Sequence, residues 1–165
     1  MRPAPPPVPG RPSDATTSLI RGFTAIELMV VLVIVAILAG LSVPVYRDHL
    51  LRANRGEARA ALLGLATAEE KFYLQCNSYT SVLDAVADTA CSPASLKFST
   101  TSERGYYILA VTAADPDGWT ATATAIATQR QNRDSRCRTF QLSSTGLKTA
   151  RNSSNAANDL ECWSK

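Results

Sequence analysis

Four cysteines and one histidine are among the residues of this 165-residue chain that could hold a metal or act as a nucleophile. The cysteines are Cys76, Cys91, Cys137 and Cys162, and no two of them form a Cys-x-x-Cys pair. Zinc ligands usually come in closely spaced pairs, and His49 lies far upstream, so the spacing disfavours a metal site. No metal or cofactor is expected. An even number of widely spaced cysteines is typical of disulfides in an oxidising compartment.

Three pairings of the four cysteines are open from the sequence. We favour Cys76–Cys91 with Cys137–Cys162, because each bond closes a short loop without crossing the other. In the chain-entropy view each bond would contribute about 3 kcal/mol. Free catalytic thiols are the alternative. The sequence contains no recognisable Ser–His–Asp or Cys–His arrangement and no glycine-rich phosphate loop. An enzyme is therefore disfavoured, and no catalytic residue is predicted.

Glu27 is the only charged side chain between Arg21 and Arg47. It precedes an uncharged run of nineteen residues, Leu28 to Tyr46. A helix of that length crosses the hydrocarbon of a bilayer at about 1.5 Å per residue. A carboxylate in lipid costs about 2.5–3.5 kcal/mol at mid-depth and less toward the surface. A plain membrane anchor whose acid reaches the headgroups is one interpretation. A secretory signal peptide is another, although the run is long for one.

The helical pattern continues to about Leu74, and Pro44 is expected to bend the helix rather than end it. One face carries small and apolar residues at three- and four-residue spacing. They are Ala58, Ala61, Leu62, Leu65, Ala68 and Phe72. The neighbouring face is expected to be solvated or to meet another subunit, and it carries Asp48, Arg52, Arg55 and Arg59. Glu69 falls on the apolar stripe, where we expect a polar contact at its rim.

Beyond the helix, the apolar residues recur with a period of two, which is typical of half-buried strands. Strands are predicted over 106–112, 119–128 and 138–142, with a weaker one over 147–150, and a turn is predicted over 115–118. Consecutive strands with short turns favour an antiparallel meander. The expected fold is therefore α+β. A long N-terminal helix, membrane-spanning in its first half and amphipathic in its second, packs on a three- to four-stranded antiparallel sheet.

Four arginines gather near the third predicted strand, and an exposed basic patch could bind DNA phosphates. They are Arg130, Arg133, Arg136 and Arg138. A solvated turn is the favoured interpretation. The net charge is +3, and without residues 1–22 it falls to +1, from 14 basic and 13 acidic residues. That balance is too even to predict a phosphate-binding surface.

Residues 21–29, Arg-Gly-Phe-Thr-Ala-Ile-Glu-Leu-Met, resemble the class III signal of type IV pilins. In that family a dedicated peptidase cuts after the glycine, and the new N-terminal residue is methylated. The resemblance implies cleavage between Gly22 and Phe23, methylation of Phe23, and Glu27 as the fifth mature residue. It implies three segments: a leader (1–22), the transmembrane and filament-core half of the helix (23–46), and a periplasmic globular head (47–165).

The resemblance extends beyond the signal, and the chain is most similar to minor pilins of the PilE kind. Pro44 stands at the family's usual kink position, and known pilins imply that Cys137–Cys162 closes the loop at the end of the sheet. Two features depart from the family. Ala36 stands where a glycine is common, with Gly40 one turn later. The leader is also long and rich in proline for a pilin.

Cleavage at this signal would give Glu27 a physical purpose. It would create a cationic amine four residues away, at the positive end of the helix dipole. In the apolar core of a filament, the acid of a docked subunit would pair with the amine of an incoming one, because an unpaired buried charge is costly. Glu27 is then an assembly residue that sets the register between neighbouring helices.

A pilin would be a structural subunit of a type IV pilus, here of the minor kind, with a role in pilus biogenesis, twitching motility or adhesion. The partners implied are other pilin subunits, major and minor, the prepilin peptidase, the inner-membrane assembly platform, and membrane lipid before assembly. The subunit would span the bacterial inner membrane once, with its head in the periplasm, and then enter the extracellular pilus. A DNA-uptake pilin and a type II secretion pseudopilin are the alternatives. The disulfide-closed C-terminal region disfavours the second.

Overall fold

The computed structural model describes residues 22–84, 91 and 95–164. The predicted leader, apart from Gly22, lies outside the described residues. The chain forms two units, Met1–Leu41 and Ser42–Lys165. The division falls five residues before the boundary expected from the sequence, which placed residues 42–46 with the transmembrane half.

Helix α1, Ala25–Cys76, is the first element of the chain, and it passes through Pro44 without ending. Thr24 precedes it, and the Thr24 Oγ1 accepts a hydrogen bond from the Glu27 N–H at 3.3 Å. A threonine in this position satisfies one of the free N–H groups of the first turn. The apolar residues of the first unit that the structure describes, within 22–41, are all exposed. By length and composition, α1 is able to cross a membrane.

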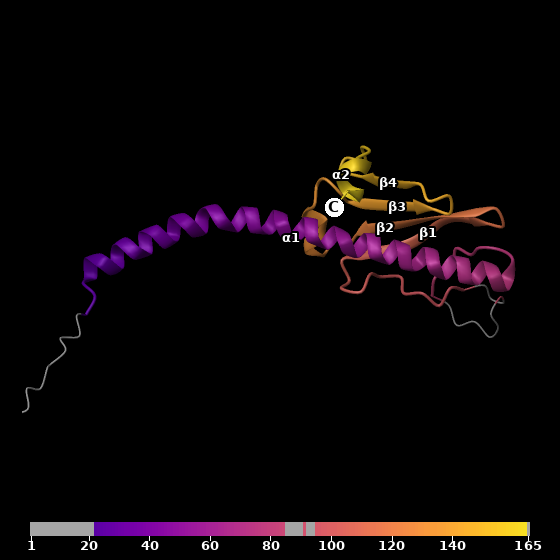
Figure 1. Ribbon diagram of the computed structural model, residues 1–165, viewed down its shortest axis with the longest axis horizontal. Coiled ribbons are helices and arrows are strands. Elements are labelled where there is room, and N and C mark those ends of the chain that lie inside the picture. The colour runs from indigo at the N-terminus through magenta and orange to yellow at the C-terminus, as the bar shows by residue number, and fades with distance from the viewer. Residues whose placement is uncertain (1–21, 85–90, 92–94, 165) are drawn as a thin grey trace, which may run out of the picture. The chain divides into compact units, whose positions relative to one another are not determined.

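Four strands follow α1 and form one antiparallel sheet in the order β1-β2-β3-β4 (Figure 1). They are β1 (Tyr107–Asp115), β2 (Gly118–Ala125), β3 (Thr139–Ser143) and β4 (Lys148–Arg151). The meander, and with it the α+β fold, is confirmed. The predicted second strand was too long, because residues 126–129 form a turn closed by the Gln129 N–H and the Ile126 carbonyl.

The turn between β1 and β2 forms where it was predicted. The Asp115 Oδ1 accepts hydrogen bonds from the N–H groups of Asp117 and Gly118, at 2.8 and 2.9 Å. A short carboxylate side chain that binds the backbone two and three residues on is a common way to stabilise a turn. The aspartate is therefore occupied within the turn.

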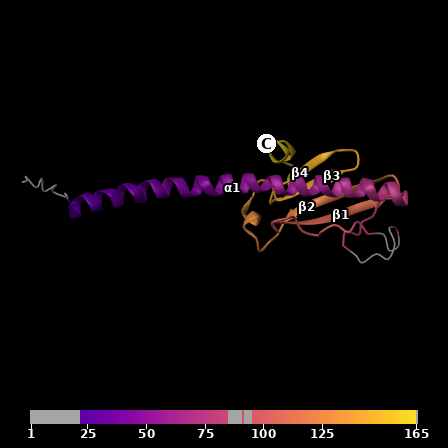
Figure 2. The ribbon, with the colours of Figure 1, turned by 60° about the horizontal axis from the view of Figure 1, so that its bottom comes forward.

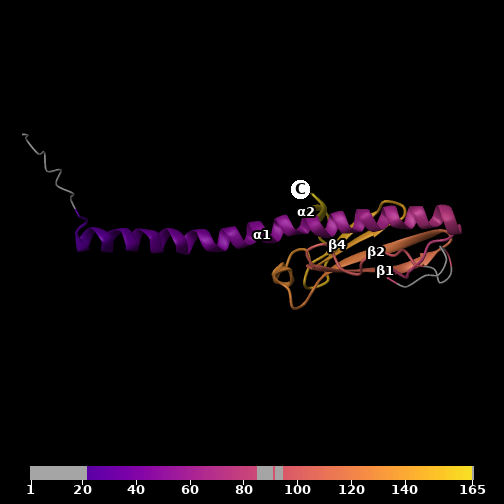
Figure 3. The same cartoon turned by 90° about the horizontal axis from the view of Figure 1, so that it is seen from below.

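One face of the sheet packs against the second half of α1, as Figures 2 and 3 show. Ala58, Leu62 and Leu65 of the predicted stripe are fully buried, and they join Tyr107 and Phe140 in the core. Burying one such aliphatic side chain stabilises a fold by about 1.5–3 kcal/mol. The core also explains the two-residue alternation of β2, whose alanines point inward and whose threonines point outward.

Glu69 lies in this core rather than at its rim, so the sequence expectation for it was wrong. Its side chain has no exposed surface. One carboxylate oxygen accepts the Thr80 N–H at 3.3 Å, and within the described part of the chain the other has no hydrogen-bond partner. Burial, aided by the neighbouring Glu70, raises the pKa of Glu69 to about 7.

The buried Glu69 carboxyl predicts a stability that falls as the pH rises. Below about pH 4.5 both the folded and the unfolded chain hold the proton, and above about pH 7 the folded chain carries a desolvated charge. We expect Glu69→Gln to raise the free energy of unfolding by about 2 kcal/mol at pH 8 and to leave it nearly unchanged at pH 4.5. Urea unfolding of the detergent-solubilised chain, followed by tryptophan fluorescence, measures both.

Glu70→Gln is the matched control for this prediction, because Glu70 is adjacent and exposed. Its carboxylate accepts hydrogen bonds from the Tyr79 hydroxyl and the Trp119 indole, which a glutamine oxygen can also accept. We expect a change below about 0.5 kcal/mol at either pH. An equal gain in both variants, or a gain for Glu69→Gln that does not depend on pH, would contradict the assignment.

Two short elements were not predicted from the sequence: the 3-10 helix η1 (Arg130–Arg133) and helix α2 (Asp159–Trp163). The Asp159 Oδ1 accepts the Ala150 N–H at 2.6 Å, and the Trp163 indole donates to the Thr149 carbonyl at 2.8 Å. These contacts fold the C-terminal segment against β4.

Candidate functional site

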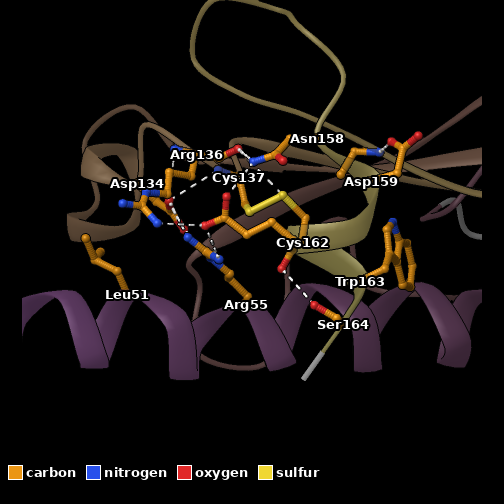
Figure 4. Close-up of a disulfide and its surroundings, with 12 residues drawn as sticks. Leu51, Arg55, Asp134, Arg136, Cys137, Asn158, Asp159, Cys162, Trp163 and Ser164 are labelled. Atoms are coloured by element: carbon orange, nitrogen blue, oxygen red, sulfur yellow. Dashed lines mark hydrogen bonds and ion pairs between the residues drawn. A yellow bond between two sulfur atoms is a disulfide. The ribbon is translucent and has the colours of Figure 1, made fainter.

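Both predicted disulfides are present, Cys76–Cys91 and Cys137–Cys162. The second lies in the core and joins the segment before β3 to α2 (Figure 4). Its Cα atoms are 5.6 Å apart. The bond therefore holds the last helix at the side of the sheet where α1 also passes.

An ion pair beside this disulfide joins α1 to the segment before β3. The Arg55 guanidinium donates to Asp134 through Nε at 2.7 Å and through Nη2 at 3.0 Å (Figure 4). Both side chains are more than nine-tenths buried. Arg55 was expected on a solvated or subunit-contacting face, and this was wrong. Burial lowers the pKa of Arg55, but the Asp134 hydrogen bond and charge outweigh it and raise that pKa overall.

Asp134 organises the chain around it through further hydrogen bonds. Its Oδ1 accepts the N–H groups of Arg136 and Cys137 at 3.1 and 3.2 Å. The buried Gln131 amide donates to the Asp134 Oδ2 at 3.3 Å and to the Leu51 carbonyl at 3.1 Å. A carboxylate with this many donors is well compensated for its burial. These bonds set η1 against α1.

The four arginines predicted as a patch do not act as one group. Arg138 is half-buried, and its Nη2 donates to the Asn132 carbonyl at 2.6 Å. Arg136 is exposed and pairs with Glu161 at 3.1 Å. Hydrogen bonds from Asn158 and Arg136 lower the pKa of Glu161. Within the described residues, the side chains of Arg130 and Arg133 make no hydrogen bond or ion pair.

Helix α1 contributes basic residues to the same face of the second unit. Two adjoining hollows are lined by five arginines and three acids: Arg52, Arg55, Arg59, Arg133, Arg136, Asp48, Asp134 and Glu161. The lining therefore has an excess of two positive charges. Arg59 is tied to the carbonyls of Trp163 and Ser164, at 3.3 and 2.9 Å. Arg52 and Arg133 are exposed and, in the part of the chain that is described, unpaired. We call this surface the arginine face.

Gly22, Phe23 and Glu27, the processing and assembly residues expected from the resemblance, lie in the first unit and are exposed. The side chain of Glu27 makes no hydrogen bond or ion pair with any described residue. Sequence reasoning missed a second feature of this stretch. Thr24-x-x-Glu27 has the spacing of a helix capping box, and the Thr24 half of that box is formed.

Residues 44–141, more than half of the chain, match the sequence model of the type IV minor pilin ComP family. That family is described as a DNA uptake sequence receptor. The chain belongs to this family of type IV minor pilins. The match covers the helix half that packs on the sheet, the Arg55–Asp134 pair, the first two strands and the beginning of β3. It leaves Glu27 and Cys162 outside.

Curated relatives of this minor pilin include other pilins. It is 41% identical over 64 residues to a fimbrial protein of Neisseria meningitidis, with 39% of this chain and 38% of that one covered. It is 33% identical over 98 residues to the type IV major pilin protein PilE1 of Neisseria gonorrhoeae, with coverages of 59% and 42%. The chain thus spans less than half the length of these curated relatives.

Among solved structures, the minor pilin is similar to the non-core minor pilin PilV of Neisseria meningitidis. The sequence identity is 19%, the TM-score is 0.48, and the match covers 66% of this chain and 93% of that one.

Within the described residues of the minor pilin, no cluster of three or more His, Cys, Asp or Glu side chains could hold a metal ion. His49, the single histidine, lies exposed on α1. All four cysteines are in disulfides. Two features of the described residues are candidate functional surfaces: the exposed apolar helix with its acid, and the arginine face.

Proposed function

We propose that this minor pilin is a structural subunit of a type IV pilus, which waits in the bacterial inner membrane and then enters a filament. One observation carries the proposal. The first unit presents a helix whose apolar side chains are exposed, and the single acid Glu27 stands near its start. Such a surface is stable in lipid or against the same surface of neighbouring subunits, but not in water.

The proposal includes the maturation that the signal stretch implies. A prepilin peptidase cuts between Gly22 and Phe23, Phe23 is methylated, and an inner-membrane assembly platform passes the subunit to other pilins. Residues 23–46 form the membrane and filament-core segment, and the head, residues 47–165, is periplasmic before assembly. Pro44 lies inside α1, and a bend there would let the head point away from the axis of the core helix. Roles in twitching motility or adhesion follow from membership of the filament.

Mass spectrometry of the protein purified from bacterial membranes tests the maturation. We expect a mass that starts at methylated Phe23 and lacks four hydrogens because of two disulfides. The same protein should be found in the sheared surface filaments. A mass that still includes residues 1–22, or absence from the filaments of a piliated strain, would contradict the proposal.

A deletion strain separates a pilus subunit from a type II secretion pseudopilin. We expect the strain to secrete its type II substrates normally but to lose twitching or adhesion. Loss of secretion with intact twitching would assign the chain to the secretion system instead.

A second candidate function is DNA capture by the head during uptake. Two findings support it: the family description names a DNA uptake sequence receptor, and the arginine face has an excess of two positive charges. Arg52 and Arg133 are exposed and, among the described residues, have no ion-pair partner, so their charge is available to phosphates. This surface differs from the predicted patch, because Arg138 is occupied by the Asn132 carbonyl.

Neutralising the arginine face should weaken DNA binding in a salt-dependent way. We expect Arg52→Gln/Arg133→Gln to lower the affinity of the full chain, in zwitterionic nanodiscs, for duplex DNA about tenfold at low salt. The slope of log affinity against log salt should fall by about two, because two phosphate contacts are lost. Lys71→Gln/Arg104→Gln removes the same charge from two other exposed positions and should change neither value. Equal effects in both variants would reduce the binding to general charge attraction.

A further inference from the structure

The second unit has a groove between α1 and η1. It shares Leu51 and Arg133 with the hollows of the arginine face, and its other lining residues differ from theirs. It has a volume of about 550 Å³, and its walls are mainly apolar. Val43, Tyr46 and Leu50 of α1 form part of the wall, and Arg47, Arg130 and Arg133 stand around it. The Gln131 amide, which donates to the Leu51 carbonyl at 3.1 Å, holds η1 beside the helix and so keeps the groove formed.

The charge of this groove is of one sign. Three guanidinium groups line it, and no carboxylate is among the described residues that do so. Arg47, Arg130 and Arg133 are exposed, and their side chains make no hydrogen bond or ion pair with any described residue. Arginine forks bind phosphate oxygens well in this situation. The groove therefore suits an anionic group, with phosphate as the best match.

The apolar wall indicates which class of phosphate compound the groove can bind. Tyr46 is 63% exposed and Val43 is 46% exposed, so a ligand can cover apolar surface here. A nucleic acid backbone would gain little from such a wall, whereas a phospholipid places acyl chains directly next to its phosphate. The arginine face, in contrast, is lined mostly by charged and polar groups.

The position of the groove along α1 matches the surface of a bilayer. The uncharged run ends at Tyr46 and the first basic residue after it is Arg47. Nineteen helical residues at about 1.5 Å each are close to the roughly 30 Å of hydrocarbon. A tyrosine followed by arginine is the common order at a membrane interface, where the ring lies at headgroup level and the cation outside.

We propose that the groove binds one anionic phospholipid, with its phosphate on Arg47, Arg130 and Arg133 and its acyl chains along Val43, Tyr46 and Leu50. The lipid belongs to the leaflet on the side of the head. The inference rests on the proposed residence of the subunit in the membrane, but not on filament entry or DNA capture. The phosphate of the bound lipid offsets part of the charge of these three cations before assembly, and the lipid fixes the rotation of the helix at the bilayer surface.

The test uses the full chain, reconstituted in vesicles of phosphatidylcholine and phosphatidylglycerol in equal amounts. Flotation first shows whether the protein is inserted. Gentle detergent extraction and native mass spectrometry then give the ratio of anionic to zwitterionic lipid that stays bound to each chain. We expect phosphatidylglycerol to be retained at a stoichiometry of one. Arg47→Gln/Arg130→Gln should lower that ratio by roughly 30-fold, because each cation near an anionic surface strengthens binding about fivefold.

Two matched variants make the result specific. Lys71→Gln/Arg104→Gln removes the same charge and should retain the lipid fully. Arg52→Gln/Arg133→Gln removes one of the three groove cations, so the ratio of anionic to zwitterionic lipid should fall by at most about sixfold. Insertion without preference for the anionic lipid, or a preference unaffected by Arg47→Gln/Arg130→Gln, would overturn the inference alone. If Arg47→Gln/Arg130→Gln loses DNA binding and keeps the lipid, the groove is a DNA site and the inference is also overturned. Failure of the wild-type chain to float would instead refute the proposed membrane residence.

Discussion

Replacing Asp134 by alanine is expected to lower the free energy of unfolding by about 3–5 kcal/mol, a large part of the roughly 5–15 kcal/mol that is typical of a folded domain. The variant leaves the Arg55 guanidinium buried, with the Glu161 carboxylate at 3.6 Å as its one remaining ion-pair partner among the described residues. It also removes the acceptor for the N–H groups of Arg136 and Cys137. Urea unfolding of the detergent-solubilised chain measures the loss.

Two further variants separate the charge from the hydrogen bonds. Arg55→Met/Asp134→Asn removes both charges but keeps an oxygen for the two N–H groups, so it should cost clearly less than Asp134→Ala. Arg136→Gln breaks the exposed pair with Glu161 and should cost below about 1 kcal/mol. If Asp134→Ala also cost below about 1 kcal/mol, the pair would not be what holds α1 to the segment before β3.

Glu27→Ala is expected to insert into the membrane like the wild type but to enter filaments at least tenfold less. In the proposed filament core, the wild-type acid would pair with the amine of the next subunit, and the variant would leave that amine unpaired in apolar surroundings. A tenfold loss corresponds to about 1.4 kcal/mol, a modest part of what one unpaired buried charge costs. Quantitative immunoblots of sheared filaments and of membranes from the same cells give the ratio.

The capping box requires a control for this prediction, because Glu27 stands at its third position after Thr24. Glu27→Gln keeps the shape and the capping capacity of the side chain but not its charge. It should therefore assemble as poorly as Glu27→Ala, while Glu27→Asp should assemble better than either. Normal assembly of Glu27→Gln would mean that Glu27 only caps the helix or reaches the headgroups.

Much of the fold followed from the sequence because the signals were local. Helix α1 was predicted to end at about Leu74 and ends at Cys76. The alternation of alanine and threonine in β2 and the Asp115 turn each depend on residues within reach of one another along the chain. Both disulfides followed from loop length, and the type IV pilin resemblance was strongest in one short stretch of exact residue types, residues 21–29.

The errors occurred where the decisive partner is distant in sequence. Arg55 and Asp134 are 79 residues apart, and helical spacing alone grouped Arg55 with its exposed neighbours Asp48 and Arg52. Glu69 accepts from Thr80, in a segment without periodicity, so its burial had no local signal. The arginines of the predicted patch are close along the chain, but Arg136 pairs with Glu161, which is 25 residues away. Contacts between residues that are far apart in the sequence leave no trace in the two-residue period of a strand or the 3.6-residue period of a helix, so these patterns do not predict them.

The Cys137–Cys162 bond has a mechanical consequence. The loop that it closes contains β3 and β4 and has a sequence separation of 25 residues. If the two ends of the chain were pulled apart, those residues could not lengthen, which removes about 85 Å from the extension of the fully stretched chain. Single-molecule pulling of the wild type and of Cys137→Ala/Cys162→Ala, which keeps the Cys76–Cys91 bond, would reveal that hidden length. A subunit under a pulling force would therefore extend over only part of its chain length, and the residues of β3 and β4 would remain inside the closed loop.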